Sequence, residues 1–156
     1  MLCRTGDPQA GKKPVMSLGL TLFVEHGREQ EAVDFYAAAF GGRVEASHDH
    51  KGHVIAVDLV IDGTPVSVAG ANPKRQQSPS LGGPFHPKAA GAVSAIVQLQ
   101  VADLGAAVHA ALSAGATVRD PIQPDQTGRR VASVFDPFGH IWALLERQAA
   151  AQPRAA

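Results

Sequence analysis

The sequence lacks the features that would tie it to a disulfide scaffold, a membrane or a nucleic acid. Its 156 residues contain one cysteine, Cys3, which excludes an internal disulfide framework and a thiolate metal site. Acidic and basic residues balance at 14 each, so no basic excess favours nucleic acid or an anionic membrane surface. No apolar run reaches the roughly 18 residues of a membrane helix, and the first residues lack the apolar core of a signal peptide. We therefore expect a cytoplasmic protein.

The remaining composition is that of a globular chain with one core. Hydrophobic residues make up 45% and charged residues 18% of the sequence. Residues 1–16 and 148–156 are predicted to be disordered tails, and Met16 is a second possible start. Residues 17–147 are expected to form a single domain.

The same order of predicted elements occurs twice in this domain. Alternating and amphipathic patterns predict a strand, a helix and three strands at 18–24, 29–40, 43–47, 54–61 and 64–69. The same five elements are predicted again at 93–101, 104–114, 116–119, 130–135 and 140–146. The chain thus divides into module one (17–70), a Pro- and Gly-rich linker (71–92) and module two (93–147). The expected fold is α+β, with each helix covering one face of its sheet and the other face buried against the second module or curved around a cavity.

In each module, a predicted turn precedes the last strand. Asp136-Pro137-Phe138-Gly139 combines a proline that presets φ with a glycine that accepts a left-handed backbone. Asp62-Gly63 predicts a tight hairpin in the corresponding place of module one.

Several motifs in this order resemble a known family. They are Ser78-Pro79-Ser80-Leu81-Gly82-Gly83, Val101-Ala102-Asp103-Leu104, Ala114-Gly115-Ala116-Thr117-Val118 and Asp136-Pro137-Phe138-Gly139-His140-Ile141-Trp142. Together with the duplicated βαβββ order, they resemble the vicinal oxygen chelate superfamily of glyoxalase I, extradiol dioxygenases and fosfomycin and bleomycin resistance proteins. The resemblance is greatest to its PhnB-like branch. It implies curved mixed sheets around a cavity and a homodimer.

In metal-dependent members of that superfamily, ligands come from the first and last strand of each module. The positions carried over are Gly19, Ser67, Ile96 and Ala143, and a two-residue shift in register offers Thr21, Gln98 or Ile141 instead. A divalent cation needs several carboxylate, imidazole or thiolate ligands, which these side chains do not supply. We therefore expect no metal cofactor at this site.

Histidines elsewhere offer an alternative metal site. His48, His50 and His53, with Asp49, form a cluster that can bind metal, but a turn between two strands predicts a solvated loop there. His140 is expected to bond to backbone within its own turn rather than to a ligand.

The strand alternation predicts which residues face the cavity. The expected ligand-binding residues are Thr21, Phe23, Ser67, Ile96, Gln98, Gln100, Ile141 and Ala143. They make a mixed pocket, apolar with a few hydrogen-bonding groups, as small-molecule sites usually are. The two glutamines either bind a ligand or are satisfied by water at the sheet rim. The resemblance adds Arg129, although the aromatic residue of the related motif is absent here.

Asp58 is the candidate catalytic residue on the same face. Burial would raise the pKa of its carboxyl and suit it to act as a general base. Pairing with Arg43 or with an arginine of Arg129-Arg130 is the alternative, and the more frequent fate of a buried acid.

Three functions follow from these expectations. The first is metal-free binding of a small, partly hydrophobic molecule in the cavity. The second is a lyase, isomerase or dioxygenase of the glyoxalase type that uses a metal or Asp58. The third is a structural or regulatory module with a filled cavity and no ligand.

Overall fold

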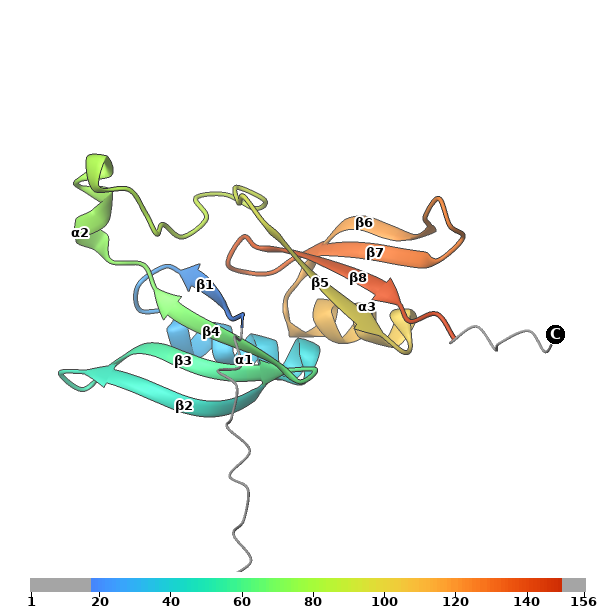
Figure 1. Cartoon of the computed structure of the whole chain (residues 1–156), viewed down its shortest axis with the longest axis horizontal. Helices are drawn as coiled ribbons and strands as arrows, with labels where there is room; N and C mark the ends of the chain where they lie inside the picture. Colours follow the sequence, from blue (N-terminus) through green and yellow to red (C-terminus); the bar gives the residue numbers. More distant parts are fainter. Residues whose placement is uncertain (1–17, 150–156) are drawn as a thin grey trace, which may run out of the picture.

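The structure is a computed structural model, and it describes residues 18–149. The two predicted tails, apart from Gln148 and Ala149, lie outside the described residues. Module one consists of β1 (Leu20–Val24), α1 (Glu29–Phe40), β2 (Arg43–His50), β3 (His53–Ile61) and β4 (Thr64–Gly70). Module two repeats this order with β5 (Ile96–Val101), α3 (Leu104–Ala114), β6 (Thr117–Pro124), β7 (Arg130–Phe135) and β8 (Ile141–Glu146). Figure 1 shows the two modules side by side.

Each module contains one four-stranded mixed sheet. The strand orders are β1-β4-β3-β2 and β5-β8-β7-β6, with the first pair of each order parallel and the others antiparallel. Registers correspond between the modules, since Thr21 pairs with Ser67 and Gln98 pairs with Ala143. Strands β1 and β5 are edge strands, and the two sheets do not close into a barrel. The α+β fold with two βαβββ modules is therefore confirmed.

Helices α1 and α3 begin and end as their sequences predict. Asp103 caps α3 through its side chain, which accepts a hydrogen bond from the Ala106 amide at 2.9 Å. Gly41 and Gly115 end the two helices in the left-handed conformation, which glycine adopts without steric cost. On α1 the buried stripe includes Phe35 and Tyr36. Both helices therefore carry the apolar face that the 3.6-residue period predicts.

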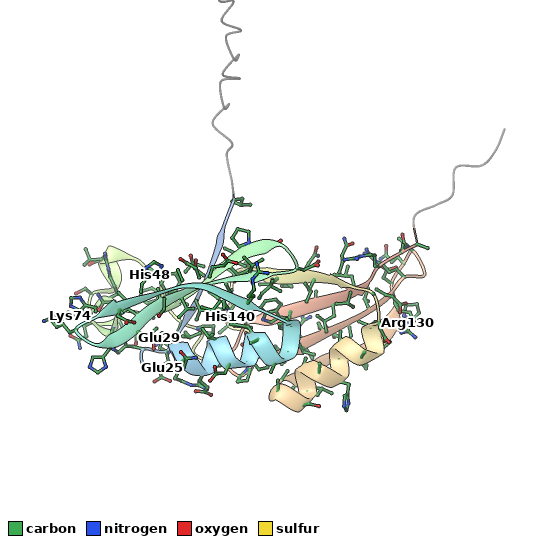
Figure 2. The ribbon with its side chains drawn as sticks, turned by 90° about the horizontal axis from the view of Figure 1, so that it is seen from below. Glu25, Glu29, His48, Lys74, Arg130 and His140 are labelled. Atoms are coloured by element: carbon green, nitrogen blue, oxygen red, sulfur yellow. The ribbon has the colours of Figure 1, made fainter. Side chains whose placement is uncertain are left out.

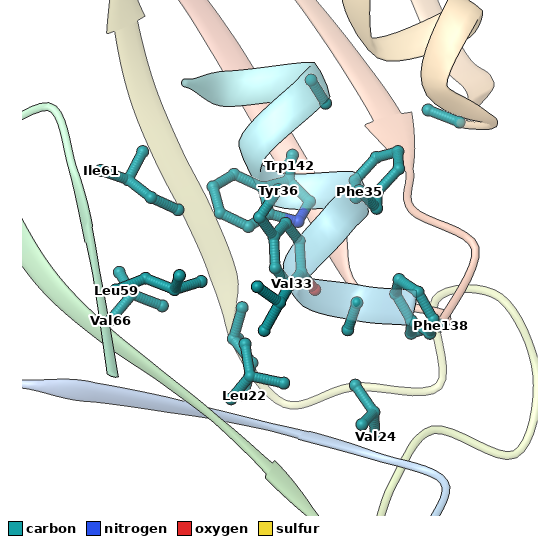
Figure 3. Packing of buried hydrophobic residues seen from close by; sticks show 14 of the residues in the cluster. Leu22, Val24, Val33, Phe35, Tyr36, Leu59, Ile61, Val66, Phe138 and Trp142 are labelled. Carbon is teal, nitrogen blue, oxygen red and sulfur yellow. The ribbon is translucent and has the colours of Figure 1, made fainter. Parts of the chain in front are cut away.

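The two helices lie side by side on the same side of the sheets (Figure 2). Their shared core joins Tyr36 of α1 to Trp142 of β8, with ring centroids 5.3 Å apart (Figure 3). The ring centroids of Phe40 and Trp142 are 4.3 Å apart. Aromatic burial of this kind contributes about 1.5–3 kcal/mol per fully buried side chain. The modules are thus joined through their helix-covered faces, and the opposite faces of the sheets are left open.

Asp136 fixes the contact between the modules. Its Oδ2 accepts hydrogen bonds from the Tyr36 hydroxyl at 2.6 Å and the Trp142 indole at 3.0 Å. Its Oδ1 accepts bonds from the backbone amides of Phe138 and His140, both at 2.9 Å. Burial, followed by the Asp136 charge, raises the pKa of Tyr36 well above its ordinary value. The predicted turn therefore places a buried carboxylate that serves both modules.

Several predicted strand boundaries are wrong. β2 extends to His50 and β3 begins at His53, so the connection is only Lys51-Gly52, both with positive φ. β5 begins at Ile96 rather than at residue 93, because its partner strand β8 begins at Ile141. β6 continues to Pro124, with register irregularities along its pairing with β7. Tight hairpins and bulges depend on strand pairing, which single-strand patterns do not contain.

The linker also contains regular structure that the sequence did not predict. It includes the short helix α2 (Pro73–Gln76) and the 3-10 turn η1 (Pro79–Leu81). No helix in the described part of the chain is long and apolar enough to span a membrane.

Candidate functional site: a cleft between the modules

A cleft runs between the edge strands β1 and β5 and contains two hollows. The larger has a volume of about 420 Å³ and lies between these strands, the linker and His140. The smaller has a volume of about 260 Å³ and lies between β5 and the β3–β4 hairpin. Leu20 and Val97 line both, so the hollows adjoin. Beside the smaller hollow, Nη2 of Arg147, which follows β8, lies 3.6 Å from Oδ2 of Asp62 in module one.

Five of the predicted ligand-binding residues line this cleft. Thr21, Phe23 and Ile96 line the larger hollow, and Gln98 and Gln100 line the smaller. Ile96 is 51% exposed, and both glutamines are exposed, so these side chains face open space rather than a dry core. Along β1 and β5 the exposure of the side chains alternates in the predicted phase, although Leu20, Leu22, Val97 and Leu99 of the other face also line the hollows.

The remaining predicted residues lie outside the two hollows. Ser67 is next to Thr21 in the sheet but hydrogen-bonds to Asp58. Ile141 pairs with Ile96 and is buried. Ala143 lines a separate hollow of about 240 Å³ on the open face of module two. Arg129 lies in the β6–β7 turn, where its Nε donates to Asp125 at 3.2 Å.

The register shows which of the positions carried over by resemblance lie next to each other. Thr21 pairs with Ser67 and Gln98 with Ala143, which is the set that the two-residue shift on β1 and β5 offers. Two hydroxyls, one amide and one methyl group do not form a donor set for a divalent cation. These residues do not fit the metal of the metal-dependent members, and we derive no chemistry through it.

The predicted environment of Asp58 is wrong. Its carboxylate is not buried beside an arginine. It accepts a hydrogen bond from the Ser67 hydroxyl at 2.6 Å, and its Oδ2 lies 2.7 Å from His48 Nε2. The side chains of His48 and Asp58 are 53% and 42% exposed. The His48 hydrogen bond, followed by that of Ser67, lowers the pKa of Asp58 rather than raising it. Arg43 instead pairs with Glu45 at 2.8 Å.

A lowered pKa makes Asp58 a weaker base than the prediction required. Module two does not repeat this pair, since Ser133 and Ala143 occupy the β7 and β8 positions that correspond to Asp58 and Ser67. Asp120 pairs with Ser133 in the sheet and bonds to its hydroxyl, and Arg119 lies 2.7 Å from Asp120. This second carboxylate–serine pair joins β6 to β7, the equivalents of β2 and β3, so it is not a repeat of Asp58 and Ser67.

The histidine cluster is not a loop. His48 and His50 lie on β2 and His53 begins β3, where His50 and His53 pair across the hairpin. Within residues 18–149, no three side chains of the His, Cys, Asp and Glu types converge closely enough to hold a metal ion. The region predicted as a solvated loop is therefore a paired β-hairpin.

Sequence reasoning missed the contribution of the linker and of His140. Phe85, Pro87 and Ala92 of the linker line the larger hollow, although the linker carries no periodicity. His140 Nε2 lies 2.9 Å from the backbone oxygen of Phe23, in the other module and not in its own turn. The only available signal was Phe85, an aromatic residue in an otherwise polar and Pro-rich segment.

Comparisons with known proteins give a consistent picture. The family model described as Glyoxalase/Bleomycin resistance protein/Dioxygenase superfamily matches residues 22–144. An uncharacterised protein of Mycobacterium bovis is 34% identical over 117 residues, which is 72% of each chain. A gene product of Arabidopsis thaliana has a similar structure, with a TM-score of 0.62, 26% identity, and coverage of 85% of this chain and 99% of its own.

A fosfomycin resistance protein of Listeria monocytogenes also has a similar structure. The TM-score is 0.59 at 15% identity, and the match covers 84% of this chain and 90% of that protein. That structure is an E126Q mutant in complex with Mn(II) and a dihydroxypropylphosphonic acid. At this identity the similarity shows the fold alone.

Proposed function

The chain belongs to the glyoxalase/bleomycin resistance protein/dioxygenase superfamily, and we propose that it binds a small, partly hydrophobic molecule in the cleft between its modules, without a metal. The observation that carries this proposal is the composition of the larger hollow. Eight of its lining residues have large apolar side chains: Leu20, Leu22, Phe23, Phe85, Pro87, Val93, Ile96 and Val97. Thr21, Ser94 and His140 add hydrogen-bonding groups. Concave, largely apolar sites with a few polar groups are typical of small-molecule recognition.

The size of the hollow is also appropriate. A cavity of roughly 150 Å³ accommodates benzene, and the larger hollow has about 420 Å³. A bicyclic aromatic molecule therefore fits the available volume. The donor set at the family's metal positions supports the metal-free form of the proposal, because Thr21, Ser67, Gln98 and Ala143 bring no carboxylate or imidazole.

A cleft-filling variant tests this proposal. Ile96→Trp places a large side chain at the wall of the larger hollow, whereas Ile55→Trp makes the same change at an exposed strand position outside both hollows. A panel of one- and two-ring aromatic compounds is screened for thermal stabilisation. We expect hits that stabilise the wild type and Ile55→Trp but not Ile96→Trp. Equal stabilisation of all three proteins would contradict binding in the cleft.

Calorimetric titration of chelator-treated protein with zinc, nickel, manganese and ferrous iron tests the absence of the metal. We expect that none of these ions binds tightly at one equivalent per subunit. One tight equivalent lost in Gln98→Ala would place a metal in the cleft and favour the enzyme alternative. Loss in a His50→Ala, His53→Ala double variant would instead assign the metal to the β2–β3 hairpin.

We extend the proposal to a homodimer in the cytoplasm. The support is the open face of both sheets, where Gln98 and Gln100 are exposed and Ala143 lines a hollow with Val131 and Leu145. A second copy would cover this surface. Sedimentation equilibrium at micromolar concentration is expected to give twice the monomer mass, and a monomer mass would refute the dimer.

A further inference from the structure

His140 occupies an unusual position in the larger hollow. It is 9% exposed and lies at the end of the Asp136 turn, yet it lines the hollow. Its backbone amide donates to Asp136 Oδ1 at 2.9 Å, and its backbone oxygen accepts from the Asp136 amide at 3.0 Å. Its imidazole contacts module one through Phe23. His140 is therefore fixed at its backbone and at its ring nitrogen Nε2, as a preorganised binding group must be.

The contact with Phe23 determines the tautomer of the ring. The backbone oxygen of Phe23 can only accept a hydrogen bond, so His140 Nε2 must donate at 2.9 Å. In the neutral imidazole the other nitrogen, Nδ1, then has no proton and is an acceptor. The fold thus uses one nitrogen to join the modules and leaves the other as an acceptor of fixed direction.

Nδ1 of His140 is accessible from the hollow. Among residues 18–149 it has no hydrogen-bond partner, and the only completely buried side-chain polar atom without a partner in that range is Glu29 Oε1. Nδ1 is therefore not sealed in the core, and the open space that adjoins the ring is the larger hollow. A buried acceptor that a bound molecule covers without pairing would cost roughly 1–3 kcal/mol.

The other walls of the hollow define the rest of the ligand. No Asp, Glu, Lys or Arg lines it, so a charged ligand would find no counter-charge there. Phe23 and Phe85 supply aromatic surface from β1 and from the linker. The complementary molecule is neutral and aromatic, with one hydroxyl or N–H group.

We propose that His140 Nδ1 is the polar recognition group of the cleft and accepts a hydrogen bond from the hydroxyl or N–H of a neutral aromatic ligand, with phenols as the simplest class. This inference rests on the proposed binding function and makes it specific. His140 thereby couples ligand binding to the contact between the modules, because the same ring donates to Phe23.

Two matched probes test the inference. 2-Naphthol and 2-methoxynaphthalene have the same ring system, but only the first has a donor. Because the ether leaves Nδ1 covered and unpaired, we expect calorimetry to show 2-naphthol binding about 5- to 150-fold more tightly. In His140→Phe, which keeps an aromatic ring without the acceptor, the two affinities are expected to agree within about twofold. Phe85→Ala is the control, with both affinities reduced and their ratio retained.

A second measurement does not depend on a folded variant. Nitrogen NMR of labelled wild-type protein reports the state of His140 Nδ1 directly. Its resonance is expected to shift on addition of 2-naphthol and to stay unchanged with the ether. Equal affinity of the two probes for the wild type, or an unchanged resonance, would overturn the role of His140 while cleft binding stands. Failure of both probes to bind would overturn the cleft proposal as well.

Discussion

Gly70→Ala should destabilise the protein through one specific overlap. Gly70 ends β4, and a Cβ atom there would lie 1.9 Å from Glu29 Oε1 and 2.9 Å from Glu29 Cδ. Glu29 is 2% exposed, and its Oε2 accepts a hydrogen bond from the Gly27 amide at 2.8 Å. The φ angle of Gly70 is not in the left-handed region, so the strain is steric and not a matter of backbone conformation. The Glu29 carboxylate must therefore move.

The magnitude follows from what this movement breaks. Forcing a methyl group into a packed site costs about 1–3 kcal/mol. Loss of a hydrogen bond to the carboxylate adds about 1.5–3 kcal/mol. Relaxation offsets part of this cost, because Glu29 Oε1 accepts no hydrogen bond and its neighbour His26 Nδ1, 3.5 Å away, belongs to a half-exposed side chain that can move. We expect the free energy of unfolding to fall by about 2–3 kcal/mol.

Urea denaturation followed by circular dichroism measures this change, with a double-mutant cycle to assign it. In Glu29→Ala the two overlapping atoms are absent and the nearest remaining atom is His26 Nδ1, at 3.3 Å, so Gly70→Ala should cost less than about 1 kcal/mol there. Gly19→Ala is the control, since its Cβ would meet nothing within 4 Å. A Gly70→Ala cost below about 0.5 kcal/mol, or an equal cost with and without Glu29, would refute the reasoning.

Three further outcomes test other parts of the structure. Asp136→Asn should lower the free energy of unfolding, measured by urea titration, by about 2–4 kcal/mol. The reason is that an amide cannot accept all four hydrogen bonds of the buried carboxylate. A change near zero would contradict the role of Asp136 in joining the modules. The folded-state pKa of Asp58 is lowered, so its contribution to stability is present above the unfolded pKa of about 3.9 and is lost as pH falls through the folded value. Asp58→Asn should therefore reduce the pH dependence of the melting temperature between about pH 2 and 5. An unchanged pH dependence would count against the His48 and Ser67 contacts. In contrast, Asp58→Asn should leave the thermal shift of any cleft ligand at pH 7 unchanged, since Asp58 lines neither hollow of the cleft, and a lost shift would revive its catalytic candidacy.

The sequence predicted the secondary structure best where local periodicity is strong. The limits of α1 and α3, the Asp62-Gly63 hairpin and the facing of β1 and β5 all agree with the structure. Strand ends were less accurate, as β2 and β6 show. Their lengths depend on partner strands and on bulges, which lie elsewhere in the chain.

The candidate site was predicted in part for the same reason. Thr21, Phe23 and Ile96 follow from alternation, but the walls supplied by Phe85 and Pro87 do not. Asp58 was placed on the correct face, yet its partners were wrong, because the sequence does not show that His48 lies across the β2–β3 hairpin. A residue's face is a local property, whereas its hydrogen-bond partners are properties of the pairing.

The sequence by itself determined the duplicated α+β modules and their helix faces. These depend on residue types and on spacings within about one helix turn or one strand. Only the tertiary structure decided how the modules meet. The Tyr36–Asp136 bond joins residues 100 positions apart, and the His140–Phe23 bond joins residues 117 apart. Such contacts arise when the helices pack together, so the accessible Nδ1 of His140 and the walls of the cleft exist only in the folded chain.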